Sequence, residues 1–369
     1  MDMDGVFWVS ASVIIYTYLG YPLLLAAWAR LAPRRVHKFP FEPDSWPAVS
    51  VVVAARNEAV RLPGRVANLL ELVYPGSREI IVVSDGSTDG TVDTLREFIR
   101  LNGVSSSSLR VLEVPSAGKP SALNAGVAAA TGEILVFADA RQRFSANALV
   151  ELVANFADPR VGGATGELML DTETTASSSS VGDGVGLYWK YEKWLRRNEG
   201  AIWSTLGATG AIYALRRSLW RPLPPDTLLD DVLAPMRVVL TGYRIVFEEH
   251  AVAYDRASRG AEEESRRKTR TLAGNYQILG HEWRLLVPGL NPVWLQYMSH
   301  KVARLAVPWA LLMFLVASVF LARTSWYYAA ALTVQVGFYA LALVGAWAEA
   351  RGRRERRFDG MVQLGRGVR

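Results

Sequence analysis

Charged and polar side chains follow three short apolar runs in the first half of the chain. Each cluster combines carboxylates with cationic or hydrogen-bonding groups, and the clusters are Arg56-Asn57-Glu58, Ser84-Asp85-Gly86-Ser87-Thr88-Asp89-Gly90 and Asp139-Ala140-Arg141. Such groups can bind a polar ligand, neutralise its charge or exchange a proton with it. If the preceding runs are parallel strands, their carboxyl ends share one edge of a sheet, and all three clusters face one crevice.

Two further pairs of charged residues could do chemistry later in the chain. Asp230 and Asp231 stand at the start of an apolar helical stretch that runs to about Leu240, where paired acids can also act as a favourable helix N-terminus. Arg267 and Arg270 are three residues apart, so they share one face of a helix. A solvated basic cluster is the other interpretation of this arginine pair.

Several kinds of chemistry are excluded or disfavoured. The chain has no cysteine, so it has no thiol nucleophile, no disulfide framework and no cysteine-bound metal. It has no Gly-x-x-x-x-Gly-Lys-Ser/Thr loop, and Gly182, Gly184 and Gly186 lack the preceding strand and the full pattern of a dinucleotide site. ATPase and dehydrogenase activities are therefore disfavoured.

The elements that must position these groups alternate between strands and helices. The strand-like runs are Val49–Val53, Ile80–Val83, Val111–Val114 and Ile134–Phe137, and helix-like stretches follow them at 58–72, 88–100, 121–130 and 146–156. This alternation predicts an α/β domain with a Rossmann-like, mixed but mostly parallel sheet. We place this domain at residues 45–285.

Three uncharged runs are long enough to cross a bilayer as helices. They are Val6–Trp28, Leu305–Ala322 and Ser325–Ala348, and they predict an N-terminal transmembrane helix within 1–30 and a transmembrane hairpin over 305–349. Buried core helices are the alternative, but basic flanks and the tryptophans Trp309 and Trp326 favour spans. The acidic start and long apolar run argue against a cleaved signal peptide.

The basic residues predict the orientation of these spans. Arg30, Arg34, Arg35 and Lys38 follow the first span, and a tail at 350–369 opens with five arginines. The N-terminus is therefore expected outside, with the α/β domain and the C-terminus cytoplasmic, in a multi-pass protein of the inner (cytoplasmic) membrane. Residues 286–304 mix aromatic and basic side chains, which predicts an amphipathic helix in the membrane interface or an ordinary core helix. Because the basic residues flank the spans, nucleic acid is not an expected partner of this chain with net charge +6.

The order and spacing of the motifs resemble those of family 2 glycosyltransferases with the GT-A fold. The matching segments are Val51–Glu58, Val83–Thr91, Gly118–Gly126, Phe137–Arg141, Gly207–Ala211, Leu229–Asp231 and Arg267–Thr271. The flanking spans are similar in arrangement to those of the membrane-bound cellulose, chitin and hyaluronan synthases, although they are fewer. The resemblance covers about residues 48–285.

This resemblance implies a nucleotide-sugar site at the strand ends. The residues implied in donor binding are Ala54, Arg56, Glu58, Asp85, Lys119, Asp139 and Arg141. Asp139 is the implied ligand of a divalent cation, Mg²⁺ or Mn²⁺, at the first position of the family's Asp-x-Asp motif. Arg141 occupies the second position, where a guanidinium either weakens the metal site or takes over part of its charge.

The resemblance also implies the catalytic residues. Asp231 corresponds to the final carboxylate of the Thr-Glu-Asp motif and is the candidate general base, with Asp230 in support. Thr209 and Gly210 belong to the implied acceptor loop, and Arg267 and Arg270 could approach the leaving diphosphate. Thr271 replaces the tryptophan of the family's Gln-x-x-Arg-Trp motif. Direct displacement with one base implies inversion at the anomeric carbon.

The expected function is transfer of a sugar from a UDP-sugar to a saccharide or lipid-linked acceptor at a lipid bilayer, in polysaccharide or glycolipid biosynthesis. Three spans make a narrow bundle, so polymer export would need a partner or an oligomer. One alternative is a single addition to a polyprenyl phosphate or lipid. Another is a catalytically degenerate subunit that only binds nucleotide-sugar.

Overall fold

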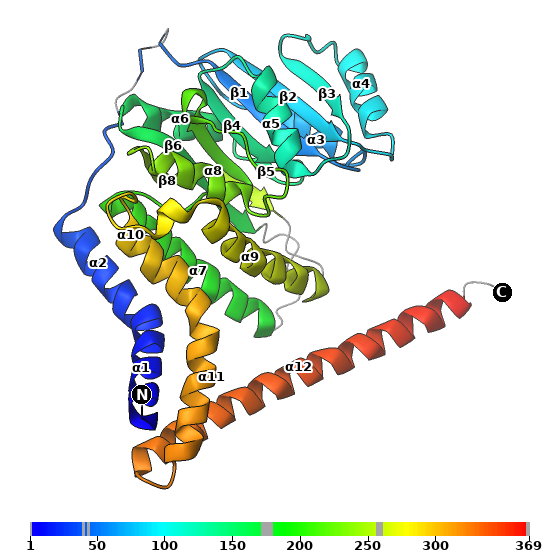
Figure 1. The fold of residues 1–369 in the computed structure, drawn as a ribbon. Helices are drawn as coiled ribbons and strands as arrows, with labels where there is room; N and C mark the ends of the chain where they lie inside the picture. Colours follow the sequence, from blue (N-terminus) through cyan, green and yellow to red (C-terminus); the bar gives the residue numbers. More distant parts are fainter. Residues whose placement is uncertain (1, 39–40, 43–44, 171–179, 256–260, 367–369) are drawn as a thin grey trace. The chain divides into compact units, whose positions relative to one another are not determined.

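The computed structural model describes residues 2–38, 41–42, 45–170, 180–255 and 261–366, and it contains every residue predicted for the site. Two compact units are present, one of residues Tyr21–Leu305 and one that joins Met1–Gly20 to Ala306–Arg369. Figure 1 shows their secondary structure along the chain. The larger unit carries the site and the smaller one most of the apolar helices.

The larger unit is built on an eight-stranded sheet with the strand order β3-β2-β1-β4-β7-β6-β8-β5. The strands are β1 (Val49–Ala55), β2 (Arg78–Asp85), β3 (Leu109–Val114), β4 (Ile134–Asp139), β5 (Arg143–Phe144), β6 (Val161–Leu170), β7 (Ile212–Arg216) and β8 (Arg244–Asp255). Strands β1 to β4 are parallel, β7 runs antiparallel to both of its neighbours, and β5 runs antiparallel to β8. The predicted mixed, mostly parallel α/β sheet is therefore confirmed.

Both faces of the sheet are buried, which explains the continuous apolar runs of its central strands. Val51 and Val53 of β1 belong to one core layer and Val52 to the other. The helices of the first layer are α3 (Leu62–Leu70), α4 (Thr91–Leu101) and α6 (Ala148–Ala154), and those of the second are α5 (Lys119–Ala129) and α8 (Asp230–Val239). Helix α5 lies very close to β1, because a Cβ added at Gly126 would come 2.5 Å from Val52 Cγ1. Figure 1 shows these layers around the sheet.

A helical layer completes the larger unit. It comprises α2 (Tyr21–Leu31), α7 (Ser180–Ile202), α9 (Ala261–His281) and the short α10 (Trp294–Gln296), which leads into a π-helical stretch, Tyr297–Val302. The buried Glu199 of α7 joins two of the other elements, since its Oε1 accepts a hydrogen bond from Tyr21 Oη at 2.9 Å and lies 2.6 Å from His300 Nδ1. Part of the predicted interfacial segment 286–304 therefore packs on the protein itself, and its position in a membrane interface stays a prediction.

The smaller unit is helical and apolar. Its helices are α1 (Met3–Ile15), α11 (Ala303–Leu321, from Ala306 on) and α12 (Trp326–Arg366), and a short connection after Leu321 joins α11 to α12. The transmembrane hairpin expected over 305–349 stays a prediction. Phe7 anchors this unit by packing against Phe314 and Tyr328, with ring centroids 4.6 and 4.7 Å apart. Helix α12 continues through most of the segment 350–369 that we predicted as a separate basic tail.

Three helical segments are long and apolar enough to cross a membrane. They are Met3–Leu31, Trp294–Leu321 and Trp326–Gly345. Large apolar side chains on them are exposed, among them Trp309, Phe320 and Phe338. The second segment begins eleven residues earlier than the predicted span, within the stretch that we assigned to the interface.

Candidate active site

Lys119 joins two acidic residues that come from different elements. The ammonium donates a hydrogen bond to Asp139 Oδ1 at 3.1 Å, and it lies 3.2 Å from Asp230 Oδ2. Lys119 is the first residue of α5, Asp139 the last of β4 and Asp230 the first of α8. We call Lys119, Asp139, Asp230 and the adjacent Asp231 the lysine–aspartate cluster. It brings together four residues that the sequence assigned to donor binding and catalysis.

Local backbone geometry brings the lysine into this cluster. Gly118 precedes α5 with φ of 90°, a conformation that L-residues rarely adopt, and it allows the chain to turn sharply into the helix. The buried Asp85 carboxylate holds this turn, because its Oδ1 accepts hydrogen bonds from the backbone amides of Ala117 at 2.7 Å and Gly118 at 3.1 Å. Asp85 therefore supports the entry to α5, whatever contact it makes with a nucleotide.

Crowding of the carboxylates changes the protonation of the cluster. Burial, with repulsion from Asp230, raises the pKa of Asp231 to about 6, while Lys119 and Arg196 oppose the shift. Burial alone would lower the pKa of Lys119, but the three nearby carboxylates hold it well above its usual value. At neutral pH the cluster therefore combines a firmly charged ammonium with a carboxylate that is a stronger base than an ordinary aspartate.

The predicted acceptor loop packs its backbone directly on Asp231. The amide of Ala208 donates to the Asp231 carbonyl at 2.7 Å, and a Cβ added at Gly210 would come 2.8 Å from Asp231 Oδ2. The Thr209 amide donates to Thr165 Oγ1 of β6 at 2.7 Å, which ties the loop to the sheet. Thr209, Gly210 and Asp231 are thus neighbours, and only a small residue fits at position 210.

Two residues near the cluster were not anticipated from the sequence. Arg196 of α7 donates to Thr209 Oγ1 at 2.9 Å and attracts Asp231. Tyr213 of β7 stacks on Phe137 with ring centroids 4.6 Å apart, and its buried hydroxyl has no hydrogen-bond partner among the described residues. Burial and the nearby carboxylates hold the pKa of Tyr213 well above its usual value, so its hydroxyl stays protonated.

The first two strand-end loops are hydrogen-bonded to each other. The amide of Asn57 donates to Ser87 Oγ at 3.1 Å, and Asn57 Oδ1 accepts from the Thr88 amide at 2.8 Å. Asn57 has φ of 55°, which asparagine tolerates better than most residues. Joined by these hydrogen bonds, the two loops form one rim at the carboxyl ends of β1 and β2.

The predicted donor residues of β1 lie around this rim with different exposure. Ala54 is directly opposite Asp139 in the β1–β4 register and is half-buried. Arg56 is exposed, and Glu58 forms an ion pair with Arg61 at 2.8 Å. Ala54 therefore adjoins the lysine–aspartate cluster, whereas Arg56 and Glu58 belong to the rim.

Arg141 pairs with a carboxylate at the end of another strand. Its Nη2 donates to Asp255 Oδ2 at 2.7 Å, and Gln142 Nε2 donates to the same oxygen at 3.0 Å. Asp255 is buried and ends β8. If Arg141 contacts a donor phosphate, as its implied role in donor binding suggests, that contact must either coexist with this ion pair or break it.

Helix α9 supports the segment that leads into α8. Arg270 Nη2 donates to the Leu228 carbonyl at 3.0 Å, and a Cβ added at Gly274 would come 2.5 Å from Leu229 Cγ. Arg267 lies over the ring of Trp189 at 5.9 Å. The two arginines thus contact the α8 entry and α7, and their predicted action on a diphosphate is not tested by these contacts.

A divalent cation fits the cluster only if water and a bound donor supply most of its oxygen ligands. Among the residues that the structure describes, no group of three or more histidine, aspartate or glutamate side chains is placed to hold a metal. Hard cations take about six oxygen ligands. Asp139, which is half-exposed, can supply one, and most of the others would have to come from water and from phosphates of a donor.

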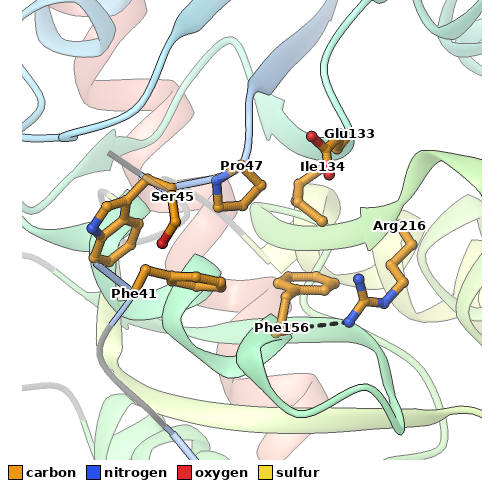
Figure 2. Close-up of a pocket in the computed structure, with 8 residues that line it drawn as sticks. Phe41, Ser45, Pro47, Glu133, Ile134, Phe156 and Arg216 are labelled. Atoms are coloured by element: carbon orange, nitrogen blue, oxygen red, sulfur yellow. Dashed lines mark hydrogen bonds between the residues drawn. The ribbon is translucent and has the colours of Figure 1, made fainter. Parts of the chain in front are cut away.

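Two cavities differ in their relation to the cluster. One of about 300 Å³ is lined by Phe41, Phe156, Ile134 and Arg216, and Figure 2 shows Arg216 beside Phe156, to whose carbonyl it donates at 2.8 Å. Ile134 begins β4 whereas Asp139 ends it, so this cavity lies at the amino end of β4 and the cluster lies at its carboxyl end. A second cavity, of about 20 Å³, is lined by Trp189, Arg196 and Thr209 among others and has room for about one water molecule.

Comparison with known proteins agrees with this geometry. Residues 50–220 match the glycosyl transferase family 2 profile. The chain is 26% identical over 287 residues to the probable glycosyltransferase YdaM of Bacillus subtilis, covering 75% of this chain and 67% of YdaM. It is 24% identical over 211 residues to the poly-β-1,6-N-acetyl-D-glucosamine synthase of Staphylococcus epidermidis, covering 56% of this chain. That match spans about half (49%) of the synthase's length.

A solved structure extends the similarity to nearly the whole chain. The mannosyltransferase PcManGT from Pyrobaculum calidifontis, in complex with GDP-Man and Mn²⁺, superposes with a TM-score of 0.69 at 22% identity. The superposition covers 94% of this chain and 100% of that one, and it shows a shared fold. With the sheet, the motifs and the sequence matches, it follows that residues 50–220 form a family 2 glycosyltransferase domain of the GT-A type and that the protein is a glycosyltransferase.

Proposed function

We propose that the protein transfers a sugar, with inversion, from a nucleoside-diphosphate sugar to an acceptor hydroxyl at a membrane, with Asp231 as the general base. The observation that carries this proposal is the position of Asp231 against the Thr209–Gly210 loop, combined with a pKa of about 6. A carboxylate of that pKa is mostly ionised at neutral pH and is a better proton acceptor than an ordinary aspartate.

The chemistry follows from this placement. Asp231 accepts the proton of the acceptor hydroxyl while the oxygen of that hydroxyl forms a bond to the anomeric carbon. The bond from that carbon to the phosphate oxygen breaks, and its electron pair leaves with the diphosphate. Lys119, held beside Asp139, neutralises part of the charge that develops there. A divalent cation bound between Asp139 and the diphosphate would supply further neutralisation.

The donor that we propose is a UDP-sugar, bound at the rim formed by the β1 and β2 loops. Ala54, Arg56, Glu58 and Asp85 line the carboxyl ends of these strands, and Lys119 and Asp139 lie where the diphosphate would be. PcManGT is solved with GDP-Man, so GDP belongs in the test beside UDP. We expect UDP to bind at least tenfold more tightly than GDP.

The acceptor that we propose is a saccharide chain, as the name of the staphylococcal relatives suggests. One observation favours a phosphate lipid as a second candidate. Lys301 lies within electrostatic reach of Arg196 and Arg304, and also of Glu192 and Glu199, near the start of the apolar segment Trp294–Leu321. A polyprenyl phosphate would place its phosphate at such a basic group, at the level of a membrane surface.

We further propose that the three apolar segments span the membrane, with the N-terminus outside and the catalytic unit and C-terminus cytoplasmic. The basic residues after the first segment and at Arg351–Arg357 support this orientation, since positive loops stay inside. Because the chain has no cysteine, single cysteines at Met3 and at Ser107 can be labelled with an impermeant reagent in intact cells. Labelling at Ser107 rather than at Met3 would contradict the orientation.

The function is tested by incubating membranes that contain the protein with radiolabelled UDP- and GDP-sugars, with and without saccharide and polyprenyl-phosphate acceptors. NMR of the product formed from an α-linked donor gives its anomeric configuration. The proposal predicts a β-linked product from a UDP-sugar. A product that keeps the α configuration would contradict the role of Asp231, and label that appears only on the lipid phosphate would support the second acceptor.

A further inference from the structure

The position of Lys119 bears on how a metal can enter this site. Its ammonium lies between Asp139 Oδ1 and Asp230 Oδ2, at 3.1 and 3.2 Å. The Asp230 side chain is only 5% exposed, so it depends on the lysine as its counter-charge. A divalent cation coordinated by Asp139 Oδ1 or Asp230 Oδ2 needs that oxygen at roughly 2.0–2.6 Å and cannot share its position with the ammonium.

The neighbouring residues do not offer an alternative metal position. At the position two residues after Asp139, where the family's motif has its second aspartate, this chain has Arg141, which is paired with Asp255 at 2.7 Å. Among the described side chains no set of three acidic or histidine residues is placed around a common point. A cation that binds Asp139 Oδ1 must therefore displace Lys119, and a cation at the other oxygen of this carboxylate would still be repelled by the ammonium.

Displacement has a cost that depends on what else is bound. An ammonium moved away from two carboxylates, and placed beside a dication, needs another anion. Water replaces the lost partners poorly in a half-buried site, whereas a diphosphate offers several charged oxygens. The same diphosphate supplies the oxygen ligands that the cation lacks in the protein.

We propose that Lys119 acts as a built-in competitor of the divalent cation, so that the cation binds Asp139 only together with the donor, whose diphosphate draws the ammonium away from the carboxylates. This rests on the proposed nucleoside-diphosphate donor. It makes cation and donor binding strongly and reciprocally coupled. Lys119 thus has two partners in turn, the aspartates before donor binding and the diphosphate after it.

The test measures Mn²⁺ binding to the full-length protein in detergent, by electron paramagnetic resonance of free Mn²⁺, with and without UDP. The wild-type protein should bind Mn²⁺ at least tenfold more weakly alone than with UDP. Lys119→Met should bind Mn²⁺ alone at least tenfold more tightly than the wild type, while its affinity for UDP falls. In Lys119→Met/Asp139→Asn the gain should disappear.

A charge-matched control separates competition from simple loss of positive charge. Arg196→Gln also removes a cation that interacts with Asp231, but Arg196 does not lie between the two carboxylates. It should change the affinity for Mn²⁺ alone by less than about threefold. An equal gain in Arg196→Gln and Lys119→Met would overturn the proposal.

Two further outcomes show how failure of the Lys119 proposal is told apart from a misfolded variant and from failure of the proposed donor chemistry. If Lys119→Met does not fold, the wild-type measurement still decides, because tight Mn²⁺ binding without UDP contradicts a competitor. If the wild type binds neither UDP nor GDP, the proposed donor chemistry fails. In that case the Mn²⁺ affinity of Lys119→Met without nucleotide still tests the competition at Asp139.

Discussion

The guanidinium of Arg196 donates a hydrogen bond to Thr209 Oγ1 at 2.9 Å and also attracts the Asp231 carboxylate. One side chain of α7 therefore holds the acceptor loop and favours the ionised form of the proposed base. Neither role could be read from its place in the sequence, because Arg196 is separated from Asp231 by 35 positions.

Replacing Arg196 should change the pH dependence of transfer. Without its positive charge, the ionised form of Asp231 is less favoured, so the pKa of Asp231 rises further above about 6. In Arg196→Gln the acidic limb of the kcat profile should move to higher pH, and kcat at pH 7 should fall by about tenfold. Thr209→Ser keeps the hydroxyl that accepts from Arg196 and serves as the control. An unshifted limb in Arg196→Gln would mean that the contact only holds the loop.

Asp231 is expected to lower the stability of the fold at neutral pH. Its pKa is about 6 in the folded protein against 3.8 ordinarily, so the folded state holds this proton more tightly than the unfolded state. The stabilisation from that proton is fully present below pH 3.8 and is lost as pH rises through about 6. Asp231→Asn should therefore raise Tm at pH 7.5 by roughly 2–4 °C for each kcal/mol regained. At pH 4 we expect little gain, and a gain of the same size at both pH values would contradict the shifted pKa.

Close packing of α9 on the entry to α8 should be sensitive to one methyl group. Alanine at Gly274 would place its Cβ 2.5 Å from Leu229 Cγ and push the α8 entry, which carries Asp230 and Asp231, out of place. We expect a loss of about 1–3 kcal/mol in unfolding free energy and a clear loss of kcat. Gly280→Ala is the matched control, because it lies on the same helix with nothing within 4 Å of its Cβ, and it should be neutral or stabilising. Thermal unfolding and transfer rates of the two variants check this, and equal effects would refute it.

Variants of the Arg141–Asp255 ion pair can show whether Arg141 stabilises the fold or binds the phosphate of the donor. Arg141→Ala removes the ion pair of the buried Asp255, which keeps its hydrogen bond from Gln142, and should cost about 1–3 kcal/mol of stability. In Arg141→Ala/Asp255→Asn much of that loss should be recovered, because the buried charge is gone. Calorimetry of UDP binding completes the test. Stability unchanged with UDP affinity lowered tenfold or more would show that Arg141 acts on the diphosphate.

The first half of the sheet could be predicted because its strands are buried on both faces. Val49–Val53 and Ile80–Val83 are unbroken apolar runs, and the structure has β1 and β2 there. Strand β6 escaped prediction because it contains Gly162, Gly163 and Gly166, which have low strand propensity. These glycines are required by packing, since a Cβ at Gly166 would come 2.3 Å from the Ala251 carbonyl oxygen of β8. Packing of this kind depends on strands that are distant in the sequence.

The candidate site was predictable to a similar degree. Asp139 and Lys119 follow from strand ends and family motifs, and the structure brings them within 3.1 Å. The Asp231 contact with the acceptor loop also agrees with the motifs. The pairing of Arg141 with Asp255 and the orphan hydroxyl of Tyr213 could not be foreseen, because they depend on how β7 and β8 join the sheet.

The central claim is that Asp231 removes the acceptor proton. The most direct measurement compares Asp231→Asn with the wild type in membranes, for sugar transfer from a radiolabelled UDP-sugar and for UDP affinity. We predict that transfer falls by roughly 10²–10⁴-fold while the Kd for UDP changes less than about threefold. Transfer within tenfold of the wild type, in a protein that still binds UDP, would contradict the account.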